Sequence, residues 1–297
     1  MTTLRNLSLA VLLLASAPLA PAQGTYTQID YPAANLTQVM GIDTAGDIIG
    51  NYSSGGLSQG FLLSSGVFTS IAYPGAAFTA VNGINDMWQV VCSGIRHNNP
   101  SVGFIYDTQT QTFTEVSTRD PNVVLAPLAI NNTGTVAGIV DETQSSPYKG
   151  FVDSSGTILF FQVPGATETW ANGISAIGEI VGYCARVNGT SKLQNFSLRA
   201  DKFKFLPIPN IPDTLVNGIN PSGSAIVGYY PQKPHVADQY YGFLYQNNVV
   251  TTIQFPGAFS TWATGINDNG EVVGYFQDAS LNYHGFTWTP SADAEKK

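Results

Sequence analysis

The feature that most constrains the fold of this chain is a short motif that recurs six times at nearly constant spacing. The clearest copy spans 265–275 and reads Gly-Ile-Asn-Asp-Asn-Gly-Glu-Val-Val-Gly-Tyr. The other copies begin at Gly41, Gly83, Ala129, Gly173 and Gly218, so successive copies start 42 to 47 residues apart. Copies at a fixed period indicate one array of similar units, although a length of 297 residues would allow two domains.

Each period predicts four short β-strands. An alternating stretch ends in Pro-Gly-Ala, as at 68–76, and the motif itself supplies an innermost strand, an Asx-Gly turn and a second apolar strand. A Gly-Phe pair such as Gly285-Phe286 then opens a third strand. Trp88 replaces the turn glycine in the second copy, so we expect a different turn there. Four-stranded units of about 40 to 50 residues are typical of β-propeller blades.

The sequence therefore predicts an all-β fold, a six-bladed β-propeller of four-stranded blades, with an open solenoid as the alternative. The repeats lie near 26–66, 67–111, 112–156, 157–201, 202–248 and 249–290, within one domain at 23–290. The last copy ends after its third strand. We expect the N-terminal strand at 26–31 to pair with the Phe286 strand and close the ring, because this pairing removes two open sheet edges.

The two ends of the chain differ from the repeats. Residues 1–22 have the pattern of a cleaved secretory signal peptide, with Arg5 before an apolar run and Ala20-Pro21-Ala22 as the cleavage site. Residues 291–297 are polar and are predicted to form a disordered tail. The apolar run is too short to span a bilayer, so we expect an extracellular or periplasmic protein without membrane insertion.

The composition narrows the range of partners. Charged residues make up 11% of the chain and the formal net charge is −8, so we expect no binding to nucleic acid. A polar, weakly charged surface suits carbohydrate contact, although it is also common in secreted β proteins. Cys92 and Cys184 occupy different repeat positions in the second and fourth copies, and we expect free or buried thiols rather than a disulfide.

The repeated motifs resemble those of the HAF-type probable extracellular repeat family of bacteria. The resemblance is carried most fully by 68–86 and 255–286 and extends over nearly all of the chain after residue 22. It implies an exported protein of β-propeller-like repeats. No catalytic residues come with the family, so none are transferred to this chain.

Candidate binding residues lie mainly in the six connections between second and third strands, which vary in length and content. In a propeller these loops gather at one mouth of the central channel, opposite the Asx-Gly turns. Trp170 and Trp262 occupy equivalent repeat positions and could form a stacking platform for a sugar or a peptide, with packing between blades as the alternative. The predicted ligand-binding set is Trp170, Trp262, Arg96, His235, Tyr240 and His284.

The sequence predicts no catalytic residues, no metal ligands and no cofactor. His97, His235 and His284 lie in three different copies and lack the close spacing typical of zinc ligands. Ser58 lies in a Gly-x-Ser-x-Gly pattern, but a nucleophile elbow needs a helix after the serine and none is predicted there.

Two functions are compatible with this pattern. The first is a monomeric, non-catalytic binding or scaffold module for carbohydrate or protein. The alternative is an extracellular polysaccharide hydrolase or lyase with its site at the variable-loop mouth. A hydrolase would need two carboxylates about 5 to 10 Å apart. The candidates are spread over several repeats: Asp141, Glu142, Glu168, Asp213, Asp238 and Asp278.

Overall fold

The computed structural model describes most of the repeat region and consists of β-strands joined by turns and loops. The described residues are 24–96, 101–118, 120, 122–142, 147–185, 192–209, 211, 213–233 and 236–291. The predicted signal peptide and nearly all of the predicted tail lie outside these ranges. Among the described residues there is no helix with the length and apolarity needed to cross a membrane.

The described strands form five sheets, four of which are antiparallel with four strands each. One sheet contains β10 (Val124–Ile130), β11 (Val136–Asp141), β12 (Lys149–Ser154) and β13 (Thr157–Phe161). The next contains β14 (Glu168–Ile174), β15 (Ile180–Ala185), β16 (Gln194–Arg199) and β17 (Lys202–Phe205). A third contains β18 (Leu215–Ile219), β19 (Ala225–Lys233), β20 (Val236–Gln246) and β21 (Val249–Ile253). The fourth combines β22 (Ser260–Ile266), β23 (Val272–Gln277) and β24 (Tyr283–Pro290) with β1 (Gly24–Ile29).

The fifth sheet has eight strands and corrects the prediction of six separate blades. It contains β2 (Leu36–Ile42), β3 (Ile48–Ser54), β4 (Leu57–Ser64), β5 (Val67–Ile71), β6 (Ala76–Ile84), β7 (Gln89–Arg96), β8 (Ser101–Asp107) and β9 (Thr112–Val116). A single parallel bridge between Ser58 and Phe78 joins β4 to β6 and so merges two sets of four strands. An all-β propeller of four-stranded blades is confirmed, whereas six separate sheets are not present.

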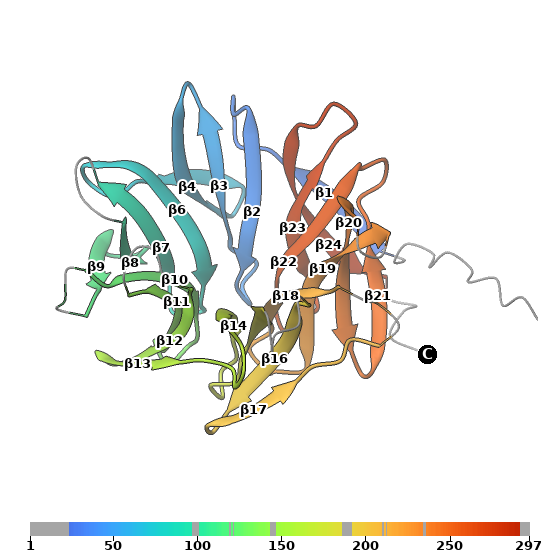
Figure 1. The fold of residues 1–297 in the computed structure, drawn as a ribbon. Helices are drawn as coiled ribbons and strands as arrows, with labels where there is room; N and C mark the ends of the chain where they lie inside the picture. The colour runs from blue at the N-terminus through green and yellow to red at the C-terminus, as the bar shows by residue number, and fades with distance from the viewer. Residues whose placement is uncertain are drawn as a thin grey trace, which may run out of the picture.

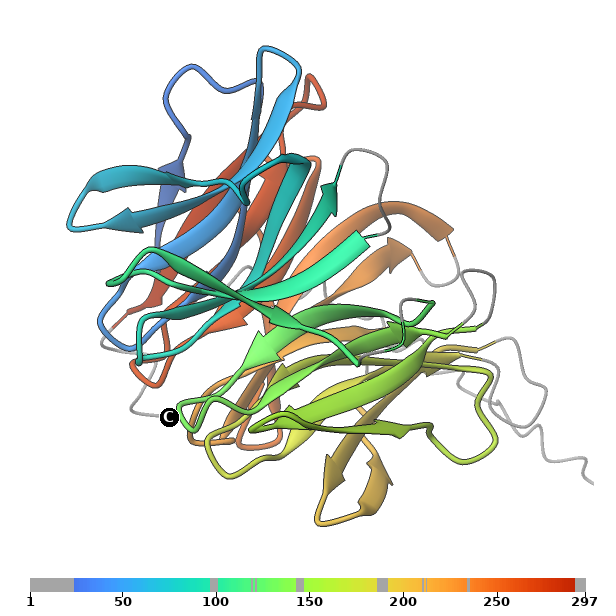
Figure 2. The same ribbon diagram turned by 90° about the vertical axis from the view of Figure 1, so that its left-hand side faces the viewer.

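The sheets surround a common axis, and the strand that leads into each Asx-Gly turn is innermost (Figures 1 and 2). Each innermost strand contacts the innermost strands before and after it, in the order β2, β6, β10, β14, β18, β22, and β22 contacts β2 again. The ring is therefore closed, and the alternative of an open solenoid is wrong.

The N-terminal strand completes the last sheet, as predicted. β1 pairs with β24 in antiparallel register, with Tyr26 opposite Trp288 and Gln28 opposite Phe286. The Tyr26 ring also lies 5.7 Å from the Phe255 ring, and its hydroxyl accepts a hydrogen bond of 3.1 Å from the Gln254 N–H. Residues from opposite ends of the sequence thus share one blade.

The core lies between the sheets, because both faces of a blade are covered by its neighbours. The phenylalanine of each Gly-Phe pair is fully buried: Phe61, Phe104, Phe151, Phe196, Phe243 and Phe286. Gly60 illustrates why glycine precedes it, since a Cβ atom there would collide with Val81 of the next innermost strand. Cys92 and Cys184 are free and buried, as predicted.

Every innermost strand contains a β-bulge at the same repeat position. The register shifts between Val39/Gly41, Val81/Gly83, Pro127/Ala129, Ala171/Gly173, Val216/Gly218 and Ala263/Gly265. Four of the bulged residues donate to a carbonyl of the next innermost strand: Asn82 to Pro127 at 2.8 Å, Asn172 to Val216 at 2.8 Å, Asn217 to Ala263 at 3.0 Å and Thr264 to Val39 at 3.0 Å. The bulges therefore link the sheets.

The Asx-Gly turns add a second set of links at one end of the axis. Side-chain amides of Asn85, Asn131 and Asn267 donate to the carbonyl oxygens of Asn131, Ser175 and Asp43, at 2.9, 3.1 and 3.0 Å. The turn of the second copy differs in part, as expected. Trp88 adopts a φ of 60°, close to the 77° of Gly134, and the Asn85 N–H donates to the Gln89 carbonyl as its counterparts do in the other turns. The other five turns also have a hydrogen bond from the glycine N–H to the carbonyl three residues earlier, which the Trp88 N–H does not make.

Candidate functional site

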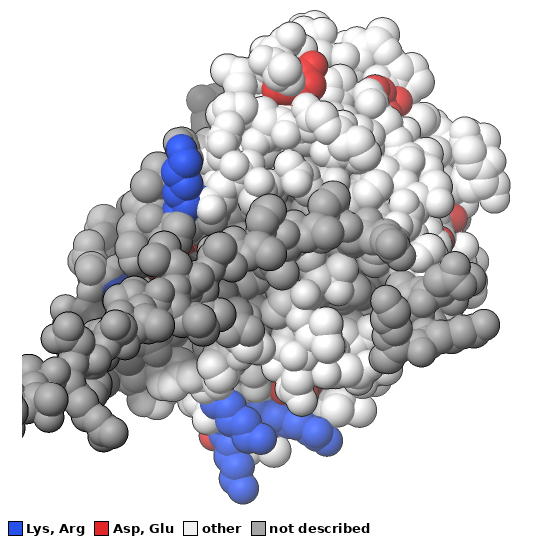
Figure 3. Space-filling model, turned by 90° about the vertical axis from the view of Figure 1, so that its right-hand side faces the viewer, with Lys and Arg blue, Asp and Glu red and all other residues white. Residues whose placement is uncertain are grey.

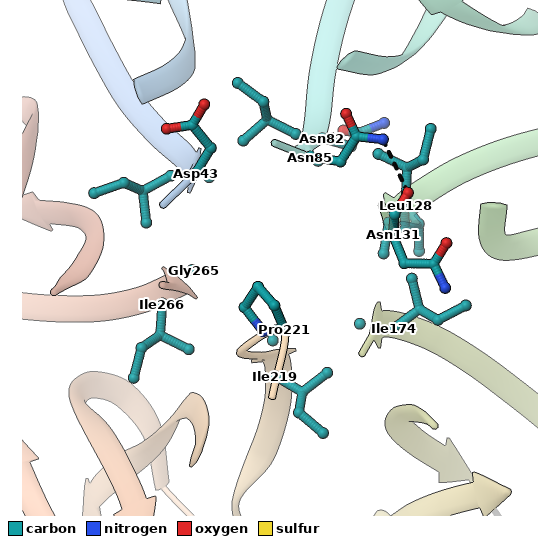
Figure 4. Close-up of a pocket in the computed structure, with 18 of the residues that line it drawn as sticks. Asp43, Asn82, Asn85, Leu128, Asn131, Ile174, Ile219, Pro221, Gly265 and Ile266 are labelled. Carbon is teal, nitrogen blue, oxygen red and sulfur yellow. Dashed lines mark hydrogen bonds between the residues drawn. The ribbon is translucent and has the colours of Figure 1, made fainter. Parts of the chain in front are cut away.

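A cavity of about 90 Å³ lies on the axis at the end that carries the Asx-Gly turns. Its walls are formed by the ends of the innermost strands, and Figure 4 shows Asp43, Asn82, Leu128, Ile219 and Gly265 around an open centre. These are residues of the shared repeat motif. The side-chain amides of Asn82, Asn172 and Asn217 in its wall already donate across the ring. The cavity is therefore explained by the way the strands meet.

Asp43 is the unusual member of this wall. It stands where four other copies have Asn, and its side chain is buried. Burial, together with the nearby carboxylates of Asp47 and Asp86, raises its pKa from 3.8 to about 6, although the Asp47 N–H donates to it at 2.8 Å. The carboxylate costs stability at neutral pH, because the charged form is poorly solvated there.

The opposite end of the axis carries a cluster of aromatic side chains around Trp262. The indole stacks on Tyr275 with a centroid distance of 5.0 Å and an interplanar angle of 24°. It also lies 5.5 Å from the Tyr240 ring and 6.1 Å from the Tyr283 ring. Tyr229 completes the cluster, 5.3 Å from Tyr240. We call these five residues the Trp262 cluster; all are only partly buried.

The local fold explains why these rings meet. Trp262 and Tyr275 lie directly opposite each other on β22 and β23, a position at which cross-strand side chains are in contact. Tyr240 comes from β20 of the preceding sheet, where its N–H donates to the hydroxyl of Ser260 at 3.1 Å. The cluster thus spans the junction between two sheets.

Trp170 forms a second, smaller group on the sheet β14–β17. Its ring stacks on Tyr183 at 5.6 Å with an interplanar angle of 13°, and Tyr148 meets it edge-on at 4.9 Å. We call Tyr148, Trp170 and Tyr183 the Trp170 triad. Its three side chains are also partly buried.

The hydroxyls of the cross-strand tyrosines Tyr183 and Tyr275 remain protonated over the ordinary pH range. Burial raises the pKa of Tyr183 and of Tyr275 above the usual value of 10, and the proximity of Tyr229 raises both further. Neutral hydroxyls can donate and accept hydrogen bonds beside an aromatic ring face. The wall they form is therefore apolar with polar tips.

The structure brings only part of the predicted ligand-binding set together. Tyr240 and Trp262 share one cluster, whereas Trp170 belongs to the separate triad. Arg96 ends β7, but its side chain lies outside the described residues, as does His235.

His284 contributes to ring closure. Its Nδ1 lies 2.8 Å from Oδ1 of Asp30, the residue that follows β1, and its Nε2 lies 3.5 Å from Oδ2 of Asp278. Because adjacent residues of a strand point to opposite faces, His284 lies on the face of β24 opposite to Tyr283. His284 therefore interacts with the residue that follows the N-terminal strand and does not belong to the Trp262 cluster.

The described carboxylates proposed for hydrolysis take part in local contacts. Glu142 forms an ion pair with Lys149. Asp278 accepts hydrogen bonds from the N–H groups of Ser280 and Asn282 at 2.8 Å, which order its loop and lower its pKa. Ser58 lies within β4 and contacts the Ser53 hydroxyl at 3.1 Å, so it is not on a nucleophile elbow. No group of His, Cys, Asp or Glu within the described part of the chain is arranged to hold a metal ion.

Of the tyrosines in the two aromatic groups, Tyr240 belongs to the predicted ligand-binding set, and the sequence reasoning missed the others. The signal was present: Tyr183, Tyr229 and Tyr275 each follow the glycine of a Val-Gly pair on the second strand. Tyr148, Tyr240 and Tyr283 each stand two residues before the glycine that opens the third strand. Aligning the copies position by position, rather than by their shared residues, would have identified them.

The comparisons with known proteins support the fold. No family model and no curated protein matches the chain. TolB from Acinetobacter baumannii is similar with a TM-score of 0.58 at 11% identity, over 86% of this chain and 66% of that chain. A variant of the Aleuria aurantia lectin in complex with Fucα1-6GlcNAc has a TM-score of 0.54 at 12% identity, over 87% of this chain and 96% of the lectin.

Two further solved structures complete this picture. The fungal lectin described as a six-bladed β-propeller has a TM-score of 0.51 at 11% identity, over 92% of this chain and 97% of that chain. A gluconolactonase from Xanthomonas campestris has a TM-score of 0.53 at 10% identity, over 93% of this chain and 98% of that chain. At such low identities these likenesses show the β-propeller fold alone.

Proposed function

We propose that this protein is a non-catalytic carbohydrate-binding module, with its site at the aromatic end of the axis. The observation that carries the proposal is the Trp262 cluster, in which five partly buried aromatic rings from two adjacent sheets meet. Aromatic side chains with polar tips match the surface of a sugar, whose ring faces present C–H groups and whose edges present hydroxyls.

The low charge of the protein supports an uncharged ligand. Only 11% of the residues are charged, and on the face in Figure 3 most of the described surface is neither basic nor acidic. An uncharged glycan needs no neutralising side chains, whereas a nucleic acid or a strongly charged polymer would. The proposal is also supported by the lectin complex among the similar structures, in which a protein of this fold binds a sugar.

The proposal includes the cellular setting and the blade count. We infer export to the cell surface or periplasm from the signal-like pattern at 1–22, and membership of the HAF-type repeat family from the shared motifs. We also infer six blades, because six innermost strands form the ring and the eight-stranded sheet divides into two equal halves at the Ser58–Phe78 bridge. A monomer is expected.

A glycan array tests the proposed function. The wild-type protein should bind a subset of neutral glycans, and the double variant Trp170→Ala, Trp262→Ala should lose at least about tenfold in affinity, because truncation removes the stacking surfaces. Thermal unfolding of both proteins checks that the loss is not due to misfolding.

A matched control is Trp88→Ala, which truncates an exposed indole at the opposite end of the axis. Its binding should equal that of the wild type. Unchanged binding by the double variant would remove both tryptophans from the site. Capture of a protein ligand together with an empty array would favour protein recognition instead.

A further inference from the structure

The Trp170 triad and part of the Trp262 cluster are built from the same three repeat positions. One residue follows the threonine of the innermost strand, and it is Trp170 in one group and Trp262 in the other. The second faces it on the next strand, as Tyr183 and Tyr275. The third stands two residues before the glycine of the Gly-Phe pair in the neighbouring sheet, as Tyr148 and Tyr240.

The two groups also share part of their geometry, although the third tyrosine lies at 70° to the indole in the triad and at 38° in the Trp262 cluster. In both, the tryptophan and its cross-strand tyrosine are stacked, at 5.6 and 5.0 Å. In both, the backbone of the third tyrosine is hydrogen-bonded to the innermost strand that carries the tryptophan. The Tyr148 carbonyl accepts the Thr169 N–H at 2.9 Å, and the Tyr240 N–H donates to the Ser260 hydroxyl at 3.1 Å. Each group therefore spans a junction between sheets and is fixed to both sides of it.

The other four junctions do not have this combination. In the order in which the positions were introduced, the residues of these junctions are Ala80, Ser93 and Ser58; Ala126, Ile139 and Ser101; Leu215, Tyr229 and Leu193; and Gln38, Asn51 and Tyr283. A feature required by blade packing would recur at every junction, as the buried phenylalanines and the bulges do. The Trp-Tyr-Tyr combination occurs at two junctions only, so the fold does not require it.

We propose that the Trp170 triad is a second carbohydrate subsite, equivalent to the one around Trp262 and able to bind an uncharged pyranose independently. This inference rests on the proposed function, since both subsites use the same stacking chemistry. The outer face of the stacked pair offers an apolar surface to the sugar ring, and the edge-on Tyr148 lies beside the indole. The protein is accordingly bivalent toward short glycans and gains avidity toward ligands that present several sugars.

The four tryptophans of the chain allow each subsite to be observed separately by NMR. The indole N–H signals of 15N-labelled protein are assigned with the variants Trp170→Phe and Trp262→Phe, which keep an aromatic ring. Cellobiose, lactose and methyl α-L-fucoside serve as probes, because each is too short to report on an extended chain. With a binding probe, the Trp170 and Trp262 signals should both shift, and both should saturate.

Two tryptophans serve as internal controls. Trp288 is buried at 2% exposure and Trp88 is exposed in a turn at the opposite end, so neither signal should move. In Trp262→Phe, the Trp170 signal should still shift, with an affinity within about twofold of wild type, because this variant retains all three side chains of the Trp170 triad. Unshifted Trp88 and Trp288 signals in each variant show that the fold is intact.

The outcomes separate the two proposals. A shift at Trp262 alone, with Trp170 unaffected at saturation, overturns the second subsite and leaves the proposed function standing. Loss of the Trp170 shift in Trp262→Phe shows one shared site and also overturns it. If neither indole responds to any of the three probes, the proposed function itself is contradicted.

Discussion

At the scale of single residues, one repeat position shows how replacing an amide by a carboxylate removes a hydrogen bond between neighbouring turns. The third residue of the Gly-Ile-Asn motif is Asn in four copies, Asp43 in the first and Ser175 in the fourth. At Asn85 and Asn131 the amide donates to the next turn. A carboxylate cannot donate, so Asp43 loses this link and is left buried with a raised pKa.

The raised pKa of Asp43 predicts that stability falls as pH rises. Between 3.8 and about 6 the folded state binds more protons at this group than the unfolded state does. Its stabilising contribution is thus complete below the lower value and is lost as pH rises through the upper one. Asp43→Asn should raise the free energy of unfolding at neutral pH by about 1 to 3 kcal/mol and flatten the pH dependence in this window. Urea unfolding at several pH values measures both effects.

The reciprocal variant Asn85→Asp provides the matched control. It places a carboxylate at the equivalent position of the next copy, where the amide donates to the Asn131 carbonyl at 2.9 Å. It should destabilise the protein at neutral pH and regain part of the loss in acid. If the free energies of unfolding of wild type and Asp43→Asn change with pH in parallel, Asp43 is not the group that titrates in this window.

At the scale of elements, the β-bulge allows an innermost strand to bond to the next sheet as well as to its own. An extra residue breaks the ladder, so its side chain is directed away from its own sheet and toward the next strand of the ring. Asn172, Asn217 and Thr264 use this position to donate to a neighbouring carbonyl. The repeated motif is therefore needed for joining the sheets as well as for turning the chain.

Asn217→Ala tests this role. The substitution removes the hydrogen bond of 3.0 Å to the Ala263 carbonyl and leaves that carbonyl without this partner in a partly buried setting. The free energy of unfolding should fall by about 1 to 3 kcal/mol. Asn269→Ala is the control, because it removes a bond of 3.1 Å to the Thr44 carbonyl at an exposed site. It should cost less than about 0.5 kcal/mol. Equal losses of unfolding free energy in Asn217→Ala and Asn269→Ala would show that the burial of the Asn217 hydrogen bond does not matter.

At the scale of the whole molecule, closure depends on residues from the two ends of the sequence. β1 supplies the outermost strand of the last sheet, and Tyr26 packs against Phe286 and Trp288 of β24 at ring distances of 6.2 and 6.5 Å. Without β1, the edge of β24 and these aromatic side chains would face solvent. An exposed edge of this kind favours association with other chains.

Deletion of residues 24–29 should therefore lower the melting temperature strongly and promote aggregation, as measured by thermal scanning and light scattering. A synthetic peptide spanning 24–31 should restore part of the stability in a concentration-dependent manner, because strand addition re-forms the β1–β24 pairing. A scrambled peptide is the control. A truncated protein with the melting behaviour of the wild type would show that closure does not depend on β1.

The candidate site was only partly predictable. Trp170 and Trp262 were identified because tryptophan is rare and both stand at one repeat position. Tyr183 and Tyr275 were not, because their role depends on lying directly opposite those tryptophans across a strand pair. His284 was placed with the ligand-binding set because of its loop position, whereas its partner Asp30 lies 254 residues away in the sequence.

The sequence by itself determined the repeat, the strand order within each unit and the need for the N-terminal strand to complete the last sheet, since these depend on local patterns and on counting strands. Tertiary structure alone decided which side chains meet across the junctions. It merged two units through Ser58 and Phe78, held Trp88 in a turn suited to glycine, and turned the bulged asparagines toward neighbouring strands. These outcomes depend on the distances between units, which no single period of the sequence contains.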